Sequence, residues 1–271
     1  MTEVMSSTQR GESRTGIRRV LLLAVLLPYL LLALISSGTG WSFPMLKPER
    51  VDLSPWTRFL ADRDRMGEAF ATSLLMSVIV GTVGTVCGLC VGRVVRHSVK
   101  SWPRFVVYLP FVLSPVIVGI SLYDLIVRLN LSSSFLGTVL VQLVFATSMT
   151  GVYFSEFWSP RADRLEQLVK CLGGGRWAVL RHAIWPSLSP VIIVCFVQAA
   201  LFSWLDYGLV SVIGGGRVRT MTVMLFGFLR EANVNQAAQS AIVLLLPTVA
   251  GFAISTTLLR SQRTHSQEFD G

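Results

Sequence analysis

Two carboxylates stand out because they interrupt long apolar stretches. Asp124 lies within the stretch Phe105–Val127, and Asp206 lies near the end of Pro190–Val210. An ionisable side chain at membrane depth is rare and usually faces the interior of a helix bundle or an aqueous path. The two carboxylates could therefore line a path that favours a cationic solute. Alternatively, each could form a hydrogen bond that joins neighbouring helices.

The polar residues near these carboxylates extend the same two interpretations. For Asp206 we favour a structural hydrogen bond, for instance with Gln198 or Tyr123, whereas both interpretations stay open for Asp124. The predicted substrate path comprises Tyr123, Asp124, Gln142, Gln198 and Asp206.

A Cys-x-x-Cys pair, Cys87 and Cys90, lies inside another apolar stretch. A redox or zinc site would need further ligands or a soluble βαβ context, and the three histidines are scattered along the chain. Close packing of small residues between helices explains the pair better, and the neighbouring Gly81, Gly84 and Gly88 predict the same close approach. We therefore expect no catalytic, metal or cofactor site.

The elements that carry these residues are expected to be membrane-spanning helices. Hydrophobic residues make up 52% of the 271 residues and charged residues only 14%, against about 25% charged residues in soluble domains. Several apolar stretches come close to the ~20 residues that a helix needs to cross a bilayer. They are Val20–Ser36, Ala69–Val91, Phe105–Val127, Leu136–Phe154, Pro190–Val210 and Ala237–Leu259. The sequence thus predicts an all-α polytopic membrane protein with six spans, in one domain over residues 18–260.

The distribution of basic residues predicts the orientation. Most of the 24 Lys and Arg residues fall on one side if the N-terminus is cytoplasmic, as the positive-inside rule requires. The first stretch is longer than the ~7–15 apolar residues of a signal peptide, so we interpret it as an uncleaved anchor. Both termini are then cytoplasmic, and the polar residues 1–17 and 261–271 are expected to be mobile tails. Topology also explains the net charge of +9, so we expect no nucleic-acid partner.

The longest predicted cytoplasmic connection, residues 155–189, reads as two helices separated by glycines. Pro160 after Ser159 predicts a helix start, and Gly173–Gly175 predict its end because glycine accepts a left-handed backbone. An apolar stripe at helical spacing follows from Leu165, Leu168, Val169 and Leu172. Such a pair could lie on the membrane surface or dock into a groove of a cytoplasmic partner.

At this connection the sequence resembles the permeases of binding-protein-dependent ABC importers of the type I fold. The signature of that family is Glu-Ala-Ala-x-x-x-Gly followed by an Ile-x-Leu-Pro ending. Four residues fall in register with it: Gly173, Trp177, Arg181 and Pro186. Gln167-Leu168-Val169 replaces Glu-Ala-Ala, and the nearest acid, Glu166, stands one position earlier.

Other segments resemble the polyamine, ferric iron and thiamine branch of the same family. They are Trp41–Pro44, Ser114–Leu122 and Asp206–Val210. The resemblance implies a coupling helix that inserts into an ATPase subunit. The implied contact residues are Leu165, Glu166, Gln167, Leu168, Val169, Leu172, Gly173, Trp177, Arg181 and Pro186.

The resemblance also implies partners and a location. A phosphate-binding loop reads G-x-x-x-x-G-K-[ST], and none of Lys47, Lys100 and Lys170 stands in that context. ATP hydrolysis is therefore expected on two separate ATPase subunits. A second permease copy or paralogue would complete the path, an extracytoplasmic binding protein would deliver the solute, and the lipid bilayer of the cytoplasmic (inner) membrane would surround the chain. We expect a polyamine or similar organic cation as substrate, with ferric iron, thiamine or a phosphonate as alternatives. A membrane enzyme or a channel is the less favoured class.

Overall fold

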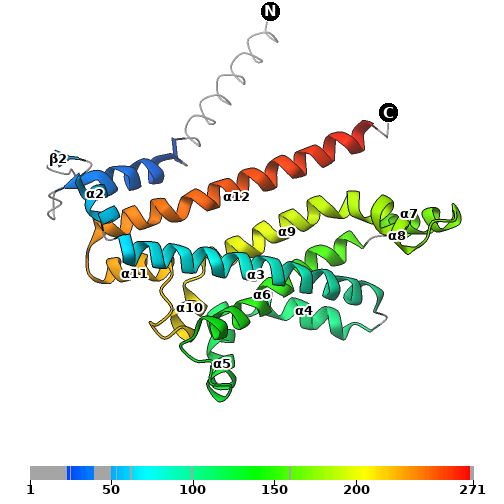
Figure 1. Cartoon of the computed structure of the whole chain (residues 1–271), viewed down its shortest axis with the longest axis horizontal. Coiled ribbons are helices and arrows are strands. Elements are labelled where there is room, and N and C mark those ends of the chain that lie inside the picture. Colours follow the sequence, from blue (N-terminus) through cyan, green and yellow to red (C-terminus); the bar gives the residue numbers. More distant parts are fainter. Residues whose placement is uncertain are drawn as a thin grey trace, which may run out of the picture. The chain divides into compact units, whose positions relative to one another are not determined.

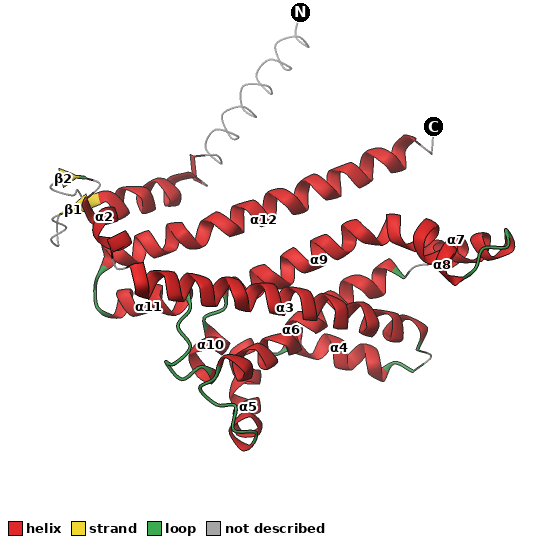
Figure 2. Cartoon of the chain, viewed as in Figure 1, coloured by secondary structure: helices red, strands yellow, loops and turns green. Residues whose placement is uncertain are grey.

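The computed structural model describes residues 23–268 except 25, 40–49, 53, 62, 99 and 159. The described chain is helical apart from two short strands (Figure 2). It divides into two compact units, one formed by residues 1–63 and 225–242 and the other by residues 64–224 and 243–271. The two units are described in turn.

The first unit joins an apolar helix, Leu26–Ser37, to the beginning of helix α12 (Val234–Glu268). Strands β1 (Gly38–Thr39) and β2 (Arg50–Val51) pair antiparallel, and helix α2 (Ser54–Ala61) follows. The last carbonyls of a helix have no partner within that helix. Here Asn235 Nδ2 donates to the carbonyls of Ile35 and Gly38, at 2.9 and 2.7 Å, and Gln239 Nε2 donates to that of Ser36 at 3.0 Å.

The second unit contains the remaining helices (Figure 1). They are α3 (Arg63–His97), α4 (Trp102–Val112), α5 (Pro115–Arg128), α6 (Phe135–Phe157), α7 (Pro160–Cys171), α8 (Arg176–Ala178), η1 (Val179–Ile184), α9 (Trp185–Leu205), α10 (Gly208–Ile213) and the rest of α12. Helix α11 (Met221–Arg230) is divided, since its residues up to Met224 belong to the second unit and residues 225–230 to the first. The helix η1 is a π-helix that runs directly into α9.

Four described helices are long and apolar enough to cross a membrane. Their candidate spans are Arg65–His97, Phe135–Phe157, Leu188–Leu205 and Val234–Thr257. They overlap the second, fourth, fifth and sixth predicted spans, which confirms a polytopic, all-α fold. The first predicted span, Val20–Ser36, lies partly outside the described residues.

The third predicted span, Phe105–Val127, is not one straight helix. It is divided into α4 and α5, and segments Trp102–Pro110 and Pro115–Arg128 meet at 104°. Proline disfavours the helical conformation in the residue before it, and Ser114 accordingly adopts an extended backbone before Pro115. Hydropathy alone treats such a stretch as continuous because proline interrupts the backbone and not the apolar character.

Two further boundaries differ from the sequence prediction. Helix α9, which carries the fifth predicted span, ends at Leu205, and Asp206 is extended. The predicted end of that span, up to Val210, therefore belongs to the separate helix α10. Helix α12 continues to Glu268, so residues 261–268 are helical where a mobile tail was expected.

Glycines on α3 let this helix pack closely on α6 and α9, as the sequence predicted. A Cβ atom added at Gly84 would lie 2.8 Å from Ala146 Cβ, and one at Gly81 would lie 2.9 Å from the Phe196 ring. The close approach also permits a hydrogen bond between helices, because Thr150 Oγ1 donates to the Gly84 carbonyl at 2.8 Å. Small residues and such bonds hold helices together in membranes, where the surrounding lipid is as apolar as the side chains.

This packing predicts opposite effects for two alanine substitutions on the same helix. Gly84→Ala should destabilise the protein by about 1–3 kcal/mol, because a methyl group is forced into a filled contact. Gly67→Ala is the matched control, since a Cβ atom added at Gly67 would have nothing within 4 Å. It should stabilise by about 0.5–1 kcal/mol through helix propensity. Thermal unfolding of the purified chain measures both, and equal effects would contradict the close contact.

Candidate coupling loop and translocation path

The segment between α6 and α9 has the helix–glycine–helix form that the sequence predicts. After α7 the amide of Gly174 donates to the Val169 carbonyl and that of Gly173 to the Lys170 carbonyl, both at 3.0 Å. Gly173 has φ +80°. This pair of bonds with a left-handed residue is the Schellman ending of a helix. The glycine therefore turns the chain sharply between α7 and α8.

The predicted apolar stripe of α7 is divided between two environments. Leu168 is 58% exposed and Leu172 81% exposed, and Trp177 on α8 is 71% exposed. Val169, in contrast, is half-buried and packs against Gly174 inside the turn. Leu168, Leu172 and Trp177 thus form an apolar surface without a covering group among the described residues, and Val169 stabilises the loop itself.

The remaining predicted contact residues are polar or flank the turn. Gln167, Arg181 and Pro186 are exposed. Leu165 lies in α7, but its side chain is outside the described part of the structure.

Glu166, the acid displaced by one position from the family signature, is paired within its own helix. Lys170 Nζ lies 2.7 Å from Glu166 Oε1. This hydrogen bond is the main reason why the pKa of Glu166 is lowered, and Arg93 and His97 at the end of α3 contribute to the same effect. Glu166 therefore carries its charge at neutral pH and faces cationic groups of this chain.

The start of the loop is held by a contact that sequence reasoning missed. The Arg93 guanidinium lies 5.1 Å from the centroid of the buried Trp158 ring, a cation–π contact between α3 and the end of α6. The sequence analysis used Arg93 only as one of the basic residues that predict the orientation. No local pattern links it to Trp158, which lies 65 residues further along the chain.

Half-buried Asp206 is the centre of a polar cluster that includes the buried Gln142 and Ser203. Gln142 Nε2 donates to Asp206 Oδ2 at 2.8 Å, and Ser203 Oγ donates to Gln142 Oε1 at 2.7 Å. The amide of Leu209 donates to Asp206 Oδ1 at 3.2 Å, and Thr222 Oγ1 to its carbonyl at 3.0 Å. Asp206 thus joins α6 and α10 through its carboxylate and α11 through its backbone carbonyl, which agrees with the structural interpretation of Asp206. Its partner is Gln142, not Gln198 or Tyr123.

The other predicted path residues lie apart from this cluster. Asp124 pairs with Arg128 on the exposed surface of α5 at 2.8 Å, and Tyr123 is also exposed. Gln198 accepts a hydrogen bond from Tyr153 at 3.3 Å. Of the five residues predicted to line a path, the structure brings Gln142 and Asp206 together. No group of three or more His, Cys, Asp or Glu that could hold a metal ion occurs in the described part of the chain.

Several apolar spans, together with a helical turn whose apolar side chains are exposed, define a polytopic membrane protein. A family profile described as "Binding-protein-dependent transport system inner membrane component" matches residues 80–265, more than half of the chain. The chain belongs to this family and is a permease subunit of an ABC importer.

Two solved structures share the fold. One is a bacterial alginate ABC transporter in complex with an alginate pentasaccharide-bound periplasmic protein, with TM-score 0.62 and 14% identity over 93% of this chain and 96% of that chain. The other is a bacterial ABC transporter involved in the import of the acidic polysaccharide alginate, with TM-score 0.66 and 14% identity over 93% and 97%. Comparison with the curated proteins finds no match.

The hydrogen bonds of Asp206 predict the effect of an apolar replacement of its partner. Gln142→Met keeps the approximate volume of the side chain but leaves Asp206 Oδ2 without its donor. We expect a loss of about 1–3 kcal/mol in stability, the usual cost of an unsatisfied buried polar group. Gln198→Met is the matched control, since it removes only the longer bond to the exposed Tyr153. Thermal unfolding distinguishes them, and a Gln142 variant as stable as the control would refute the structural role of the cluster.

Proposed function

We propose that this chain forms half of the translocation path of an ABC importer and couples closure of ATPase subunits to uptake of a small solute. The proposed complex holds a second permease copy or paralogue, two ATPase subunits on the cytoplasmic side and an extracytoplasmic binding protein on the outer loops. Outer loops of this kind would include residues 38–68 and 214–235. The chain would lie in the cytoplasmic (inner) membrane with both termini inside.

The observation that carries the proposal is the apolar surface of Leu168, Leu172 and Trp177 on the loop between α6 and α9. Large apolar side chains at such exposure favour a partner, because the free energy falls when apolar surface is removed from water. The Schellman turn at Gly173 fixes how the chain leaves α7 toward α8. Coupling requires an element whose position both sites bias, and α7 with α8 would be that element.

In this proposal no acidic residue of the loop takes the anchoring role of the glutamate in the family signature. Gln167 carries no charge, and Glu166 is engaged by Lys170. ATPase docking would therefore depend on apolar contact more than on an acid–base pair.

Replacing one leucine of this surface tests the docking. Leu172→Asp places a charge where the proposed groove is apolar, and we expect ATPase co-purification with the chain to fall roughly tenfold, about 1.4 kcal/mol. Leu129→Asp is the control, because Leu129 is likewise exposed but precedes α6, whereas the loop follows it. The ATPase retained per permease is measured after affinity purification. Equal retention by Leu172→Asp and the unsubstituted chain would rule out this surface as the ATPase contact.

A polyamine or similar small organic cation is the substrate class that we propose, supported by the resemblance of Ser114–Leu122 and Asp206–Val210 to the polyamine-type branch. Ferric iron, thiamine or a phosphonate are the alternatives. Neither carboxylate adds to this support, because Asp124 is paired with Arg128 and Asp206 is bonded to Gln142.

Uptake by the complete complex in proteoliposomes decides the substrate. We expect ATP-dependent uptake of labelled spermidine in the presence of the cognate binding protein, with no competition from alginate oligosaccharides. Competition by alginate, iron, thiamine or phosphonate in place of polyamine would reassign the substrate and leave the role of the coupling loop intact.

A further inference from the structure

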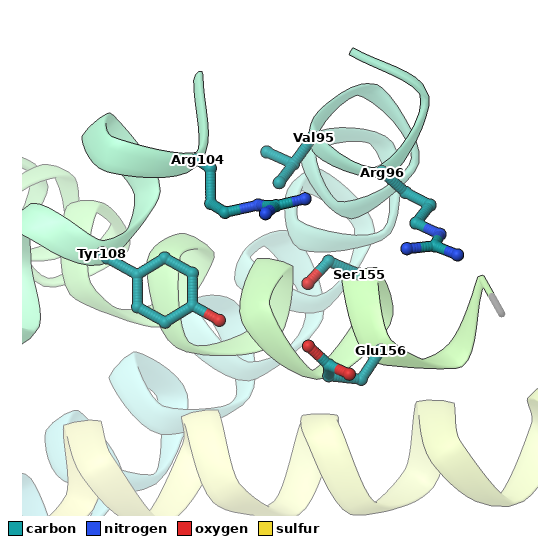
Figure 3. Close-up of a pocket in the computed structure, with 6 residues that line it drawn as sticks. All are labelled: Val95, Arg96, Arg104, Tyr108, Ser155 and Glu156. Atoms are coloured by element: carbon teal, nitrogen blue, oxygen red, sulfur yellow. The ribbon is translucent and has the colours of Figure 1, made fainter. Parts of the chain in front are cut away.

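The ends of α3, α4 and α6 line an open cavity of about 200 Å³. This volume is below the ~300–1,000 Å³ of pockets that hold whole drug-sized ligands, so the cavity suits a small polar group. The lining residues are Val95, Arg96, Arg104, Tyr108, Ser155 and Glu156. Figure 3 shows the polar ends of these side chains converging on one space from three helices. None of the six lining residues belongs to the apolar surface of Leu168, Leu172 and Trp177 or to the cluster around Asp206.

The charged groups of this cavity do not neutralise one another. Within the described residues, neither Arg96 nor Arg104 has a carboxylate within 4.0 Å, and Glu156 has no basic partner at that distance. The Tyr108 hydroxyl likewise has no hydrogen bond among those residues. Ser155 is different, since its hydroxyl donates to the Val152 carbonyl at 2.7 Å. Two guanidinium groups, a phenol and a carboxylate are therefore available to a ligand.

The types of these groups specify the chemistry of the ligand. Guanidinium groups present a planar set of donors that matches the oxygens of a phosphate. A carboxylate accepts hydrogen bonds, so Glu156 would repel a simple phosphate but bind an ammonium group. A zwitterion that carries a phosphate and an ammonium group satisfies both sets, and phosphoethanolamine is the simplest one.

The surroundings favour a ligand held in the membrane over one dissolved in water. Trp102 is 62% exposed and Phe105 68% exposed in the first turn of α4, beside Arg104. Tryptophan is enriched at the level of lipid headgroups, and basic pockets between spanning helices bind headgroups on the cytoplasmic side. Phe105 follows Arg104 on α4 and offers an exposed apolar ring to acyl chains, whereas Trp102 faces another side of the helix.

We propose that this cavity binds the headgroup of a phosphatidylethanolamine molecule. The phosphate is held by Arg96, Arg104 and the Tyr108 hydroxyl, and the ammonium group by Glu156. The acyl chains then lie along Phe105. This site requires only that the chain is embedded in a bilayer, so it stands independently of the substrate and of the ATPase contact.

The first test removes the phosphate-binding charges. The full chain is placed in nanodiscs of equal parts phosphatidylethanolamine and phosphatidylglycerol, released into the gas phase, and analysed for retained lipid by native mass spectrometry. We expect the double variant R96Q/R104Q to retain roughly tenfold less phospholipid, since both guanidinium donors to the phosphate lose their charge. K100Q is the matched control, because exposed Lys100 lies in the same short connection but does not line the cavity. Equal retention by the double variant and K100Q would overturn the site.

The second test addresses the headgroup. We expect E156Q to lose the preference for phosphatidylethanolamine over phosphatidylglycerol while retaining a similar total of lipid. An unchanged preference in E156Q would overturn the assignment of the ammonium group.

The third test distinguishes a lipid from free phosphate and detects variants that fail to fold. Dihexanoyl-phosphatidylethanolamine should raise the unfolding temperature of the unsubstituted chain, and inorganic phosphate at the same concentration should not. Equal stabilisation by phosphate would overturn the lipid assignment. Should R96Q/R104Q unfold early without any lipid, R104K replaces it: a retained charge without the planar donor set should give intermediate retention, and full retention would contradict the guanidinium–phosphate contact.

Discussion

The helices of this chain cross a medium that offers no hydrogen-bond partner, so polar groups inside the bundle depend on one another. Backbone groups are satisfied by the helices themselves. Side chains need partners on neighbouring helices, and the fold provides them where the helices approach most closely. Thr150 donates to the Gly84 carbonyl, and a Cβ atom added at Gly84 would press against Ala146 on the same helix as Thr150, so glycine permits this approach. The indole of Trp204 donates to the Leu244 carbonyl at 3.1 Å. Close packing and hydrogen bonding are therefore one constraint in this protein.

The same constraint explains the cluster around Asp206. A carboxylate where α9 ends, between two helices, would be costly without donors. Gln142, the amide of Leu209 and the neighbouring Ser203 convert it into a joint between helices. A break in a helix at membrane depth is tolerated where the freed groups are bonded inside the protein, and Asp206 occupies such a break.

At the end of the bundle that carries α7 and α8, polar groups do not depend on one another for hydrogen bonds, because water and headgroups are available there. Charges of both signs lie close together without being buried, as in the Glu166–Lys170 pair. Exposed apolar side chains are the costly groups there, and Leu168, Leu172 and Trp177 are exposed because no other described part of the chain packs over them. The family to which the chain belongs accounts for such a surface, since its members work as the membrane component of a larger transport system.

The sequence by itself determined the helical class, the position of four spans and the shape of the loop at Gly173, because hydropathy and glycine conformation are local properties. The charged residues of the loop also predicted that it lies outside the membrane. The tertiary structure alone decided the partners: Gln142 with Asp206, Arg93 with Trp158, and the convergence of Arg96, Arg104 and Glu156 on one cavity. These features depend on how helices distant in sequence are packed and rotated against one another, and no local pattern of residues records that rotation.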